Sequence, residues 1–328
     1  MSITFGAFGF SSHSGHAPSP FDAINGGRLA GSSSSHPLHD VGIDELLKRV
    51  DGPISGSITI DGPVRVGDPI KGTIDLLAME AIDARHAYLR LVGLRLVEER
   101  KSESHSSGNS TTTESWVEAD GRLFVESLFL EPAIPAQMAA GAEFKASFAI
   151  PGPPLGPPTA HLGEAIVAWA VEVRFDIRMG ADFHIATLLP IAQNPDLLAA
   201  GVGDQGGQSM LASMDVGGGT ISVQSPLPAQ AGTTLIVQAT WPGAGSGSGR
   251  IELHRRSSAP NGVNTVMGSW NVSGAELASG AARAEIPLPA DIAPSFDGAD
   301  LSLGYIVRVL VDRRFMPDDA IERPVAIA

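Results

Sequence analysis

Cysteine is absent from the 328 residues of this sequence, and its absence removes several chemistries at once. Without thiols the chain can form no disulfide bond, no thiolate metal site and no cysteine nucleophile. A reducing cytoplasm is compatible with this composition. The sequence also lacks any run approaching the roughly 18 to 20 apolar residues of a transmembrane helix, and its N-terminus MSITFGAFGF lacks the basic residues of a secretory signal. We therefore expect a cytoplasmic protein with no integral membrane segment.

Positive charge is also scarce. Lys and Arg together number 22 against 36 Asp and Glu, which gives a formal net charge of −14. Nucleic-acid binding depends on basic side chains that neutralise phosphates, and docking on an anionic membrane depends on them too. The composition therefore predicts no nucleic-acid partner and leaves proteins as the expected partners.

Motifs that would support catalysis or cofactor binding are missing as well. The sequence contains no GxSxG elbow, P-loop or HExxH pattern. GVGDQG at 201–206 matches the letters of a dinucleotide fingerprint, but it lies in a predicted linker and not between a strand and a helix. Histidines of the N-terminal tail could gather a metal and acidic loop residues could bind Ca²⁺, although a solvated spacer and solvated turns are the favoured interpretations. These residues are His13, His16, His36 and His39, and Asp297, Asp300, Asp318 and Asp319. We predict a non-enzymatic protein without cofactor or metal.

Glycine and proline, by contrast, are abundant, with 38 and 24 residues. They separate short segments in which apolar and polar residues alternate, which is the pattern of half-buried strands. Such segments follow one another from Ile54 to Ile177 and again from Thr220 to Ile327. An all-β protein with two tandem β-sandwich domains is therefore predicted, at 53–195 and 219–328, joined by a low-complexity linker at 196–218.

Residues 1–52 are predicted to form a low-complexity tail that ends in a short helix. The tail is rich in Ser, Gly, His and Pro and too poor in apolar residues to fold by itself. At 41–51, four apolar residues including Ile43 and Leu46 fall on one helical face, and Gly52 would cap the helix. The tail is either an inert spacer or a segment that orders on a partner, and its candidate contact residues are Phe5, Phe8, Phe10 and Phe21.

The ends of the two predicted domains resemble each other. Residues 168–192 and 304–328 align without a gap, and charged residues at the strand exits match as well as apolar positions. The matched pairs are Val171 and Val307, Val173 and Val309, Asp176 and Asp312, Arg178 and Arg314, Asp182 and Asp318, Ile185 and Ile321, and Ile191 and Ile327. Alternation alone recurs in any two strands, but matched Asp and Arg residues at equal spacing indicate one sandwich duplicated in tandem.

A series of turns and strands in the predicted first domain resembles the arrestin family. The series comprises Gly67, Asp68, Ile70 and Gly72; Leu89, Arg90, Leu91 and Gly93; Gly141, Phe144 and Phe148; and Pro151, Pro154, Leu155, Pro157 and Pro158. The similarity covers about 54–195 well and 219–328 more weakly. It looks closer to the bacterial arrestin-like (sporulation-control-like) and retromer-subunit-like branches than to receptor regulators. The resemblance implies two immunoglobulin-like sandwiches, with partner contacts on their concave faces and on the loop between the fifth and sixth strands.

That loop is expected at 101–114, where KSESHSSGNSTTTE contains no apolar residue. It is either a solvated hairpin or a finger that contacts a partner, and its candidate contact residues are Ser102, His105, Asn109 and Thr112.

Receptor-binding arrestins also hold a buried charged cluster at the domain junction, with an Arg on the strand before the linker. Residues 188–195 contain no basic residue, so the resemblance does not extend to that cluster. Charged residues near the strand ends could form other junction pairs, although surface salt bridges are the default interpretation. These residues are Arg174, Asp176, Arg178, Asp312, Arg313 and Arg314.

The predicted function is that of an intracellular adaptor or scaffold that binds proteins through its sandwiches and its tail. The alternative is a structural subunit of a multimeric assembly, with the tail docked on neighbouring subunits. A carbohydrate- or Ca²⁺-binding sandwich is a third hypothesis. It is disfavoured because the four Trp and two Tyr residues mostly fall in strand patterns typical of core.

Overall fold

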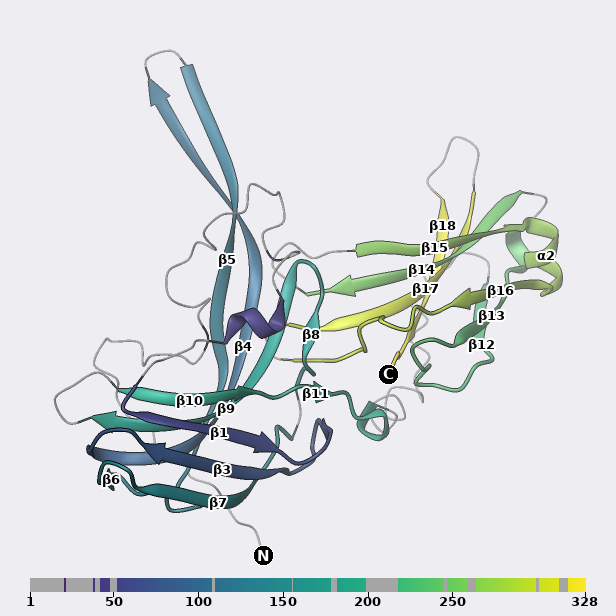
Figure 1. Ribbon diagram of the computed structural model, residues 1–328. Coiled ribbons are helices and arrows are strands. Elements are labelled where there is room, and N and C mark those ends of the chain that lie inside the picture. Colours follow the sequence, from purple (N-terminus) through teal and green to yellow (C-terminus); the bar gives the residue numbers. More distant parts are fainter. Residues whose placement is uncertain are drawn as a thin grey trace, which may run out of the picture.

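The computed structural model describes residues 21, 38, 42–47, 52–107, 110–154, 156–177, 182–198, 218–244, 247–258, 264–298, 301–312 and 318–328. This part of the chain is almost entirely β-sheet (Figure 1). The prediction of an all-β fold built from sandwiches is confirmed. None of the described helices is long and apolar enough to cross a membrane.

The first group of sheets draws all its strands from residues 54–192. One sheet has the order β1-β3-β7, the facing sheet has the order β10-β9-β4-β5, and β11 pairs in parallel with β2. β6 and β8 are short additions to β4 and β9. The bounds are β1 (Ile54–Ile60), β2 (Val64–Arg65), β3 (Ile70–Ala78), β4 (Ile82–Ser107), β5 (Ser110–Phe129), β6 (Gln137–Met138), β7 (Glu143–Ile150), β8 (Ala160–His161), β9 (Ala165–Ile177), β10 (Phe183–Leu188) and β11 (Ile191–Ala192).

The second group of sheets draws its strands from residues 220–325 and repeats the same order. β12-β13-β16 corresponds to β1-β3-β7, and β18-β17-β14-β15 corresponds to β10-β9-β4-β5. The bounds are β12 (Thr220–Val223), β13 (Thr234–Thr240), β14 (Ser248–Ser257), β15 (Asn264–Ser273), β16 (Ala282–Pro287), β17 (Leu303–Val311) and β18 (Asp319–Val325), with the short helices η3 (Pro242–Ala244) and α2 (Gly274–Ser279). We refer to the two groups as the first and second sandwich.

Strand register confirms the internal repeat that the sequence indicates. Val173 on β9 pairs with Ile185 on β10. The matched residues Val309 and Ile321 pair in the same way on β17 and β18. Equal register places the matched apolar side chains at equivalent points of the two cores, so the sequence matches follow from equal packing.

Each sandwich buries the alternating residues of its strands between its two sheets. β3 shows the expected alternation, with Ile70, Ile74 and Leu76 buried. β9 differs, because it is buried on both faces from Ala165 to Phe175. Alternation therefore identifies β3 as a strand with one solvated face, whereas β9 has the continuous apolar pattern of a strand covered on both sides.

The face of β9 that points away from the main core is covered by the N-terminal segment, by which we mean Phe21, Leu38 and residues 42–47. The predicted helix over 41–51 is wrong in extent and type: a 3₁₀ helix, η2, spans Ile43–Leu46, and Leu47 is already extended. Leu47 forms a β-bridge with Phe21. Residues 48–51, which precede the predicted cap Gly52, lie outside the described residues. Packing of Leu46 against the sheet overrides the helical period of this short segment.

The predicted loop at 101–114 is part of one long hairpin. β4 continues to Ser107 and β5 begins at Ser110, so most of these residues are paired strand. β5 then continues without a break to Phe129. Serine and threonine supply no apolar signal, but they extend a strand when the neighbouring strand continues beside them.

The low-complexity stretch that follows β11 begins with a helical turn over 195–198, and 199–217 lie outside the described residues. The sheets of the two sandwiches fall on either side of this stretch. The domain boundaries at 53–195, 196–218 and 219–328 stay a prediction, as does the character of residues 1–20.

Candidate functional site

The β4–β5 hairpin extends beyond the sheet to which it belongs. β9 accompanies β4 as far as the pair Val97–Ala165. Beyond Val97, among the described residues, β4 pairs with β5 alone, from Glu98 opposite Ala119 to Ser107 opposite Ser110. Figure 1 shows this part as an arm that leaves the body of the first sandwich. We call residues 98–107 and 110–119 the arm.

Three of the four loop residues selected from the sequence lie on the paired strands of the arm. Ser102 is exposed on β4. His105 lies directly opposite Thr112 across the hairpin. Asn109 falls at the tip, outside the described residues. The arm therefore brings this candidate set together on one projecting element.

The N-terminal segment covers the outer face of the sheet that contains β4 and β9. Phe21 and Leu38 have no exposed surface, and Leu46 is 1% exposed. They pack with residues that point away from the main core: Val92, Leu94, Leu96, Ile166, Ala168 and Ala170. The backbone N–H of Leu38 donates a hydrogen bond of 3.1 Å to Glu98 Oε1. Contact between Phe21 and another protein would therefore require this segment to leave the sheet. Phe5, Phe8 and Phe10 lie outside the described residues.

A buried ionic cluster continues the same outer face. Arg90 on β4 lies directly opposite Glu172 on β9, and Arg90 Nη2 is 2.5 Å from Glu172 Oε2. Both side chains have no exposed surface. A second carboxylate, Glu126 on β5, lies 2.5 Å from Arg90 Nη1 and is 44% exposed. Burial raises the pKa of Glu172, while Arg90 acts in the opposite direction. Burial disfavours the charge of Arg90, but the two carboxylates raise its pKa.

Three of the charged residues proposed for a domain junction, Arg174, Asp176 and Asp312, form ion pairs within their own sandwich. Arg174 binds Asp182 at 2.8 Å, and Asp176 binds Arg85 at 2.7 Å, all within the first sandwich. Burial acts to raise the pKa of Asp182, but hydrogen bonds from Arg174 and from the Ile177 N–H lower it overall. Arg178, Arg313 and Arg314 lie outside the described residues. Arg174 and Asp176 therefore form ion pairs inside the first sandwich, and their assignment to a domain junction stays a prediction.

Asp312 corresponds to Asp176 in the repeat and has an equivalent partner. Arg250 on β14 binds Asp312 Oδ1 at 2.8 Å, as Arg85 on β4 binds Asp176. The assignment of Asp312 to the junction likewise stays a prediction. Asp176 and Asp312 share a role, which is to bind an Arg of the adjacent long strand at the strand exit.

The contacts between the sandwiches centre on Arg255 and Glu164. Arg255 Nη2 is 3.1 Å from Glu164 Oε2, and its Nη1 donates to the carbonyl of Leu162 at 3.2 Å. Ser257 Oγ donates to Glu164 Oε1 at 3.1 Å. Gln193 on the exit from β11 donates to the carbonyl of Ser295 at 2.7 Å. The sequence does contain a signal for Arg255, because it occupies a position that alternation with Ile251 and Leu253 would assign to an apolar core residue.

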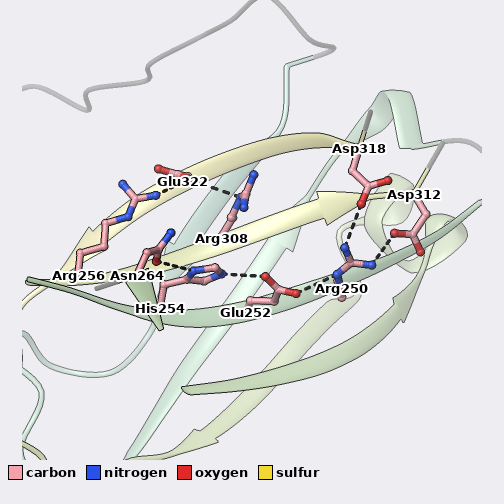
Figure 2. Close-up of polar contacts among 9 residues, drawn as sticks. All are labelled: Arg250, Glu252, His254, Arg256, Asn264, Arg308, Asp312, Asp318 and Glu322. Carbon is pink, nitrogen blue, oxygen red and sulfur yellow. Dashed lines mark hydrogen bonds and ion pairs between the residues drawn. The ribbon is translucent and has the colours of Figure 1, made fainter. Parts of the chain in front are cut away.

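The outer face of the second sandwich carries a ladder of charged residues along β14, β17 and β18 (Figure 2). Arg250 contacts Glu252 at 2.9 Å, Asp312 at 2.8 Å and Asp318 at 2.9 Å. Desolvation disfavours the charge of Arg250, but these carboxylates raise its pKa. Asp318 and Asp312 therefore act as partners of an arginine.

The ladder continues through His254. Its Nε2 lies 2.8 Å from Glu252 Oε2, and its Nδ1 lies 2.9 Å from Asn264 Oδ1. Further along, Glu322 lies 2.8 Å from Arg256 and 3.5 Å from Arg308. In the part of the chain that the structure describes, no group of His, Cys, Asp and Glu is arranged to hold a metal ion. The charged side chains of the ladder thus compensate one another, and their arrangement does not single out a catalytic group.

One shallow groove lies beside the ladder. Its volume is about 350 Å³. It is lined by Arg256, Ser257, Ser258, Ser302, Gly304, Tyr305, Ile306 and Pro324. Tyr305 is itself 1% exposed and donates a hydrogen bond of 2.7 Å to the carbonyl of Ala293. Burial raises the pKa of Tyr305 to about 12. Its hydroxyl is therefore held in the neutral form and engaged by the backbone.

Comparison with known proteins gives remote structural neighbours and no closer relative. No family model matches the chain, and no curated protein matches it. Among solved structures, the crystal structure of Spo0M, a sporulation control protein from Bacillus subtilis, aligns with 84% of this chain and 91% of that chain. The identity is 12% and the TM-score is 0.28. A likeness this remote carries no conclusion about residues, partners or activity.

Proposed function

We propose that this protein is a non-catalytic, arrestin-like adaptor or scaffold that binds other proteins, and that the arm is its main contact element. The observation that carries the proposal is the continuation of β4 past Val97, its last partner on β9. From there to Ser107 the strand pairs with β5 alone among the described residues.

Folding of such an arm by itself contributes little free energy of stabilisation. A two-stranded hairpin without a packed face is marginally stable in water, and residues 101–114 contain no apolar side chain. A hairpin that projects from its sheet has the outer edges that extended protein segments recognise by strand addition. Contact with a partner would account for an ordered arm with a polar outer part better than core stability does.

The charges support proteins as partners and the cytoplasm as the place of action. A net charge of −14 disfavours polyanions such as nucleic acids, and a chain without cysteine is suited to a reducing compartment. The arrestin-like assignment rests on the ordered turn motifs of the first sandwich and on the repeated sheet order of the second.

Photo-crosslinking from the arm tests this proposal. A photoreactive amino acid at Ser102, which is exposed on β4, should capture one protein reproducibly in cells of the native host. The matched control is the same amino acid at Ser222, an exposed position on β12. Capture from Ser102 alone would support the arm as the contact element. Equal capture from both positions, or none from Ser102, would count against it.

A shortened arm provides the second test. Glu99 and Glu118 lie directly opposite each other, so an Asn-Gly turn between them would close the hairpin without residues 100–117. Because this deletion starts beyond the pairing with β9, the unfolding midpoint should remain that of the full chain. The partner found by crosslinking should no longer co-purify. Undiminished co-purification would assign the contact to the sandwiches.

A further inference from the structure

β15 is an edge strand with unusual chemistry. It occupies one end of the sheet order β15-β14-β17-β18 and, among the described residues, pairs with β14 alone. Its sequence NTVMGSWNVS contains no charged residue and no proline. Val266 is 50% exposed and Met267 is 40% exposed. Edge strands are normally protected from pairing with other chains by charges, proline or bulges.

The equivalent edge of the first sandwich has the charges that β15 lacks, while a single bulge, at Met267 on β15 and at Phe124 on β5, is common to both edges. β5 carries five charged residues, of which four are acidic: Glu114, Glu118, Asp120, Arg122 and Glu126. Two copies of β5 placed side by side would bring carboxylates together, which is destabilising. The two edges occupy the same position in the repeated sheet order, so their difference in charge is a property of the side chains and not of the fold.

We propose that β15 is a self-association surface, at which the β15 strands of two copies of this chain pair antiparallel about a two-fold axis. An isologous contact brings each strand against its own copy, and a strand without charges meets that copy without like-charge repulsion. The result would be one sheet that runs continuously through both second sandwiches.

Local geometry suits this pairing. The bulge of β15 is confined to Met267, which lies between the pairs Leu253–Gly268 and His254–Val266 and has no partner on β14. From Gly268 to Ser273 the register on β14 is regular, so this part of β15 has the straight backbone that strand addition needs. The exposed Val266 and Met267 would lie beside the new contact and lose apolar surface to water on association.

Net charge sets the salt dependence of the association. Each copy carries −14, so two copies repel each other at long range. At about 0.1 M salt charges are screened beyond about 10 Å, and at 1 M beyond about 3 Å. Because the contact itself contains no ion pair, added salt should tighten the dimer.

Sedimentation equilibrium on the full chain tests the proposal. The wild-type chain should show a concentration-dependent dimer whose dissociation constant falls with added salt. Lysine in place of both Val266 and Met267 should raise the dissociation constant of the dimer by about tenfold or more, because the lysines of one copy would then repel those of the other. The matched control, Leu128→Lys with Leu130→Lys, places the same charges on two exposed residues at the end of β5 and directly after it, and should leave the dimer intact. A chain that stays monomeric at all concentrations would overturn the proposal.

Site-specific crosslinking locates the contact. The chain has no cysteine, so Ser269→Cys introduces a single thiol at an exposed position of β15. A short bismaleimide should join two copies through this thiol and should not join copies that carry Leu130→Cys in its place. Dimers that persist in the β15 lysine variant, or that crosslink through residue 130, would show that another surface associates. Circular dichroism of each variant verifies that the sandwiches remain folded.

Discussion

Replacing Arg90 by Met should destabilise the first sandwich strongly and in a pH-dependent manner. Arg90 and Glu172 have no exposed surface and lie 2.5 Å apart. Removal of one partner from a buried ion pair leaves an uncompensated charge and costs about 3 to 5 kcal/mol. Arg90→Met leaves Glu172 in that position, while Glu126, at 44% exposure, can turn to water. We expect a loss of about 3 to 5 kcal/mol at neutral pH.

The pH dependence identifies the cause of this loss. Burial already raises the pKa of Glu172, and Arg90 is the main group that opposes that rise, with a smaller contribution from Arg174. Without Arg90 the pKa of Glu172 rises further, so the folded state binds a proton that the unfolded state releases. Stability then falls as pH rises from the ordinary glutamate range, about 4.3, toward the raised value in the folded state. The variant should therefore be closest to wild type in acid and furthest from it at neutral pH.

Urea unfolding followed by tryptophan fluorescence at several pH values measures this effect. The double variant Arg90→Met with Glu172→Leu removes both charges and should recover most of the lost stability. Lys145→Met is the matched control, because the Lys145–Asp75 pair is exposed, at 73% and 57%, and should be worth less than about 1 kcal/mol. A loss in Arg90→Met that is the same at every pH would refute the assignment to an uncompensated carboxylate.

Three further expectations follow from the packing. Leu46→Ala should cost about 2 to 5 kcal/mol in urea unfolding, since Leu46 is 1% exposed and packs against the sheet from the N-terminal segment. Leu197→Ala, at 39% exposure, should change stability little. Gly72→Ala should destabilise the folded protein by about 1 to 3 kcal/mol, because the added Cβ would lie 2.2 Å from the carbonyl oxygen of Thr59 on the neighbouring strand. A Cβ at Gly304 meets nothing within 4 Å, so Gly304→Ala should be tolerated, and thermal unfolding of the two variants measures the difference. Tyr305 should ionise near pH 12 in ultraviolet difference titration, and because its pKa is raised in the folded state, its contribution to stability is present below pH 10 and lost as pH rises from about 10 to 12.

Local pattern was sufficient where structure depends on neighbours in the chain. Alternation broken by Gly and Pro predicted the strands, and the gapless match between 168–192 and 304–328 predicted the common register that Val173 and Val309 adopt. Pattern failed at 41–51, and at 101–114 it predicted a hairpin but not that the strands of the hairpin are paired almost to its tip. In the first segment, burial of Leu46 against a distant sheet overrode a helical period. In the second, a run of polar residues was drawn into a strand because β4 and β5 continue to pair.

The amino-acid sequence alone determined that this protein is all-β, that it consists of two similar sandwiches in tandem, and that it offers no motif for catalysis. These properties follow from composition and from short-range periodicity, which do not depend on contacts between distant parts of the chain. Only the tertiary structure decided which charges meet. Arg174 and Asp176 pair within one sheet, whereas Glu164 and Arg255, 91 residues apart, join the two sandwiches. Such contacts depend on which strands are neighbours after folding. A charged residue in the sequence does not indicate which distant residue will be its partner.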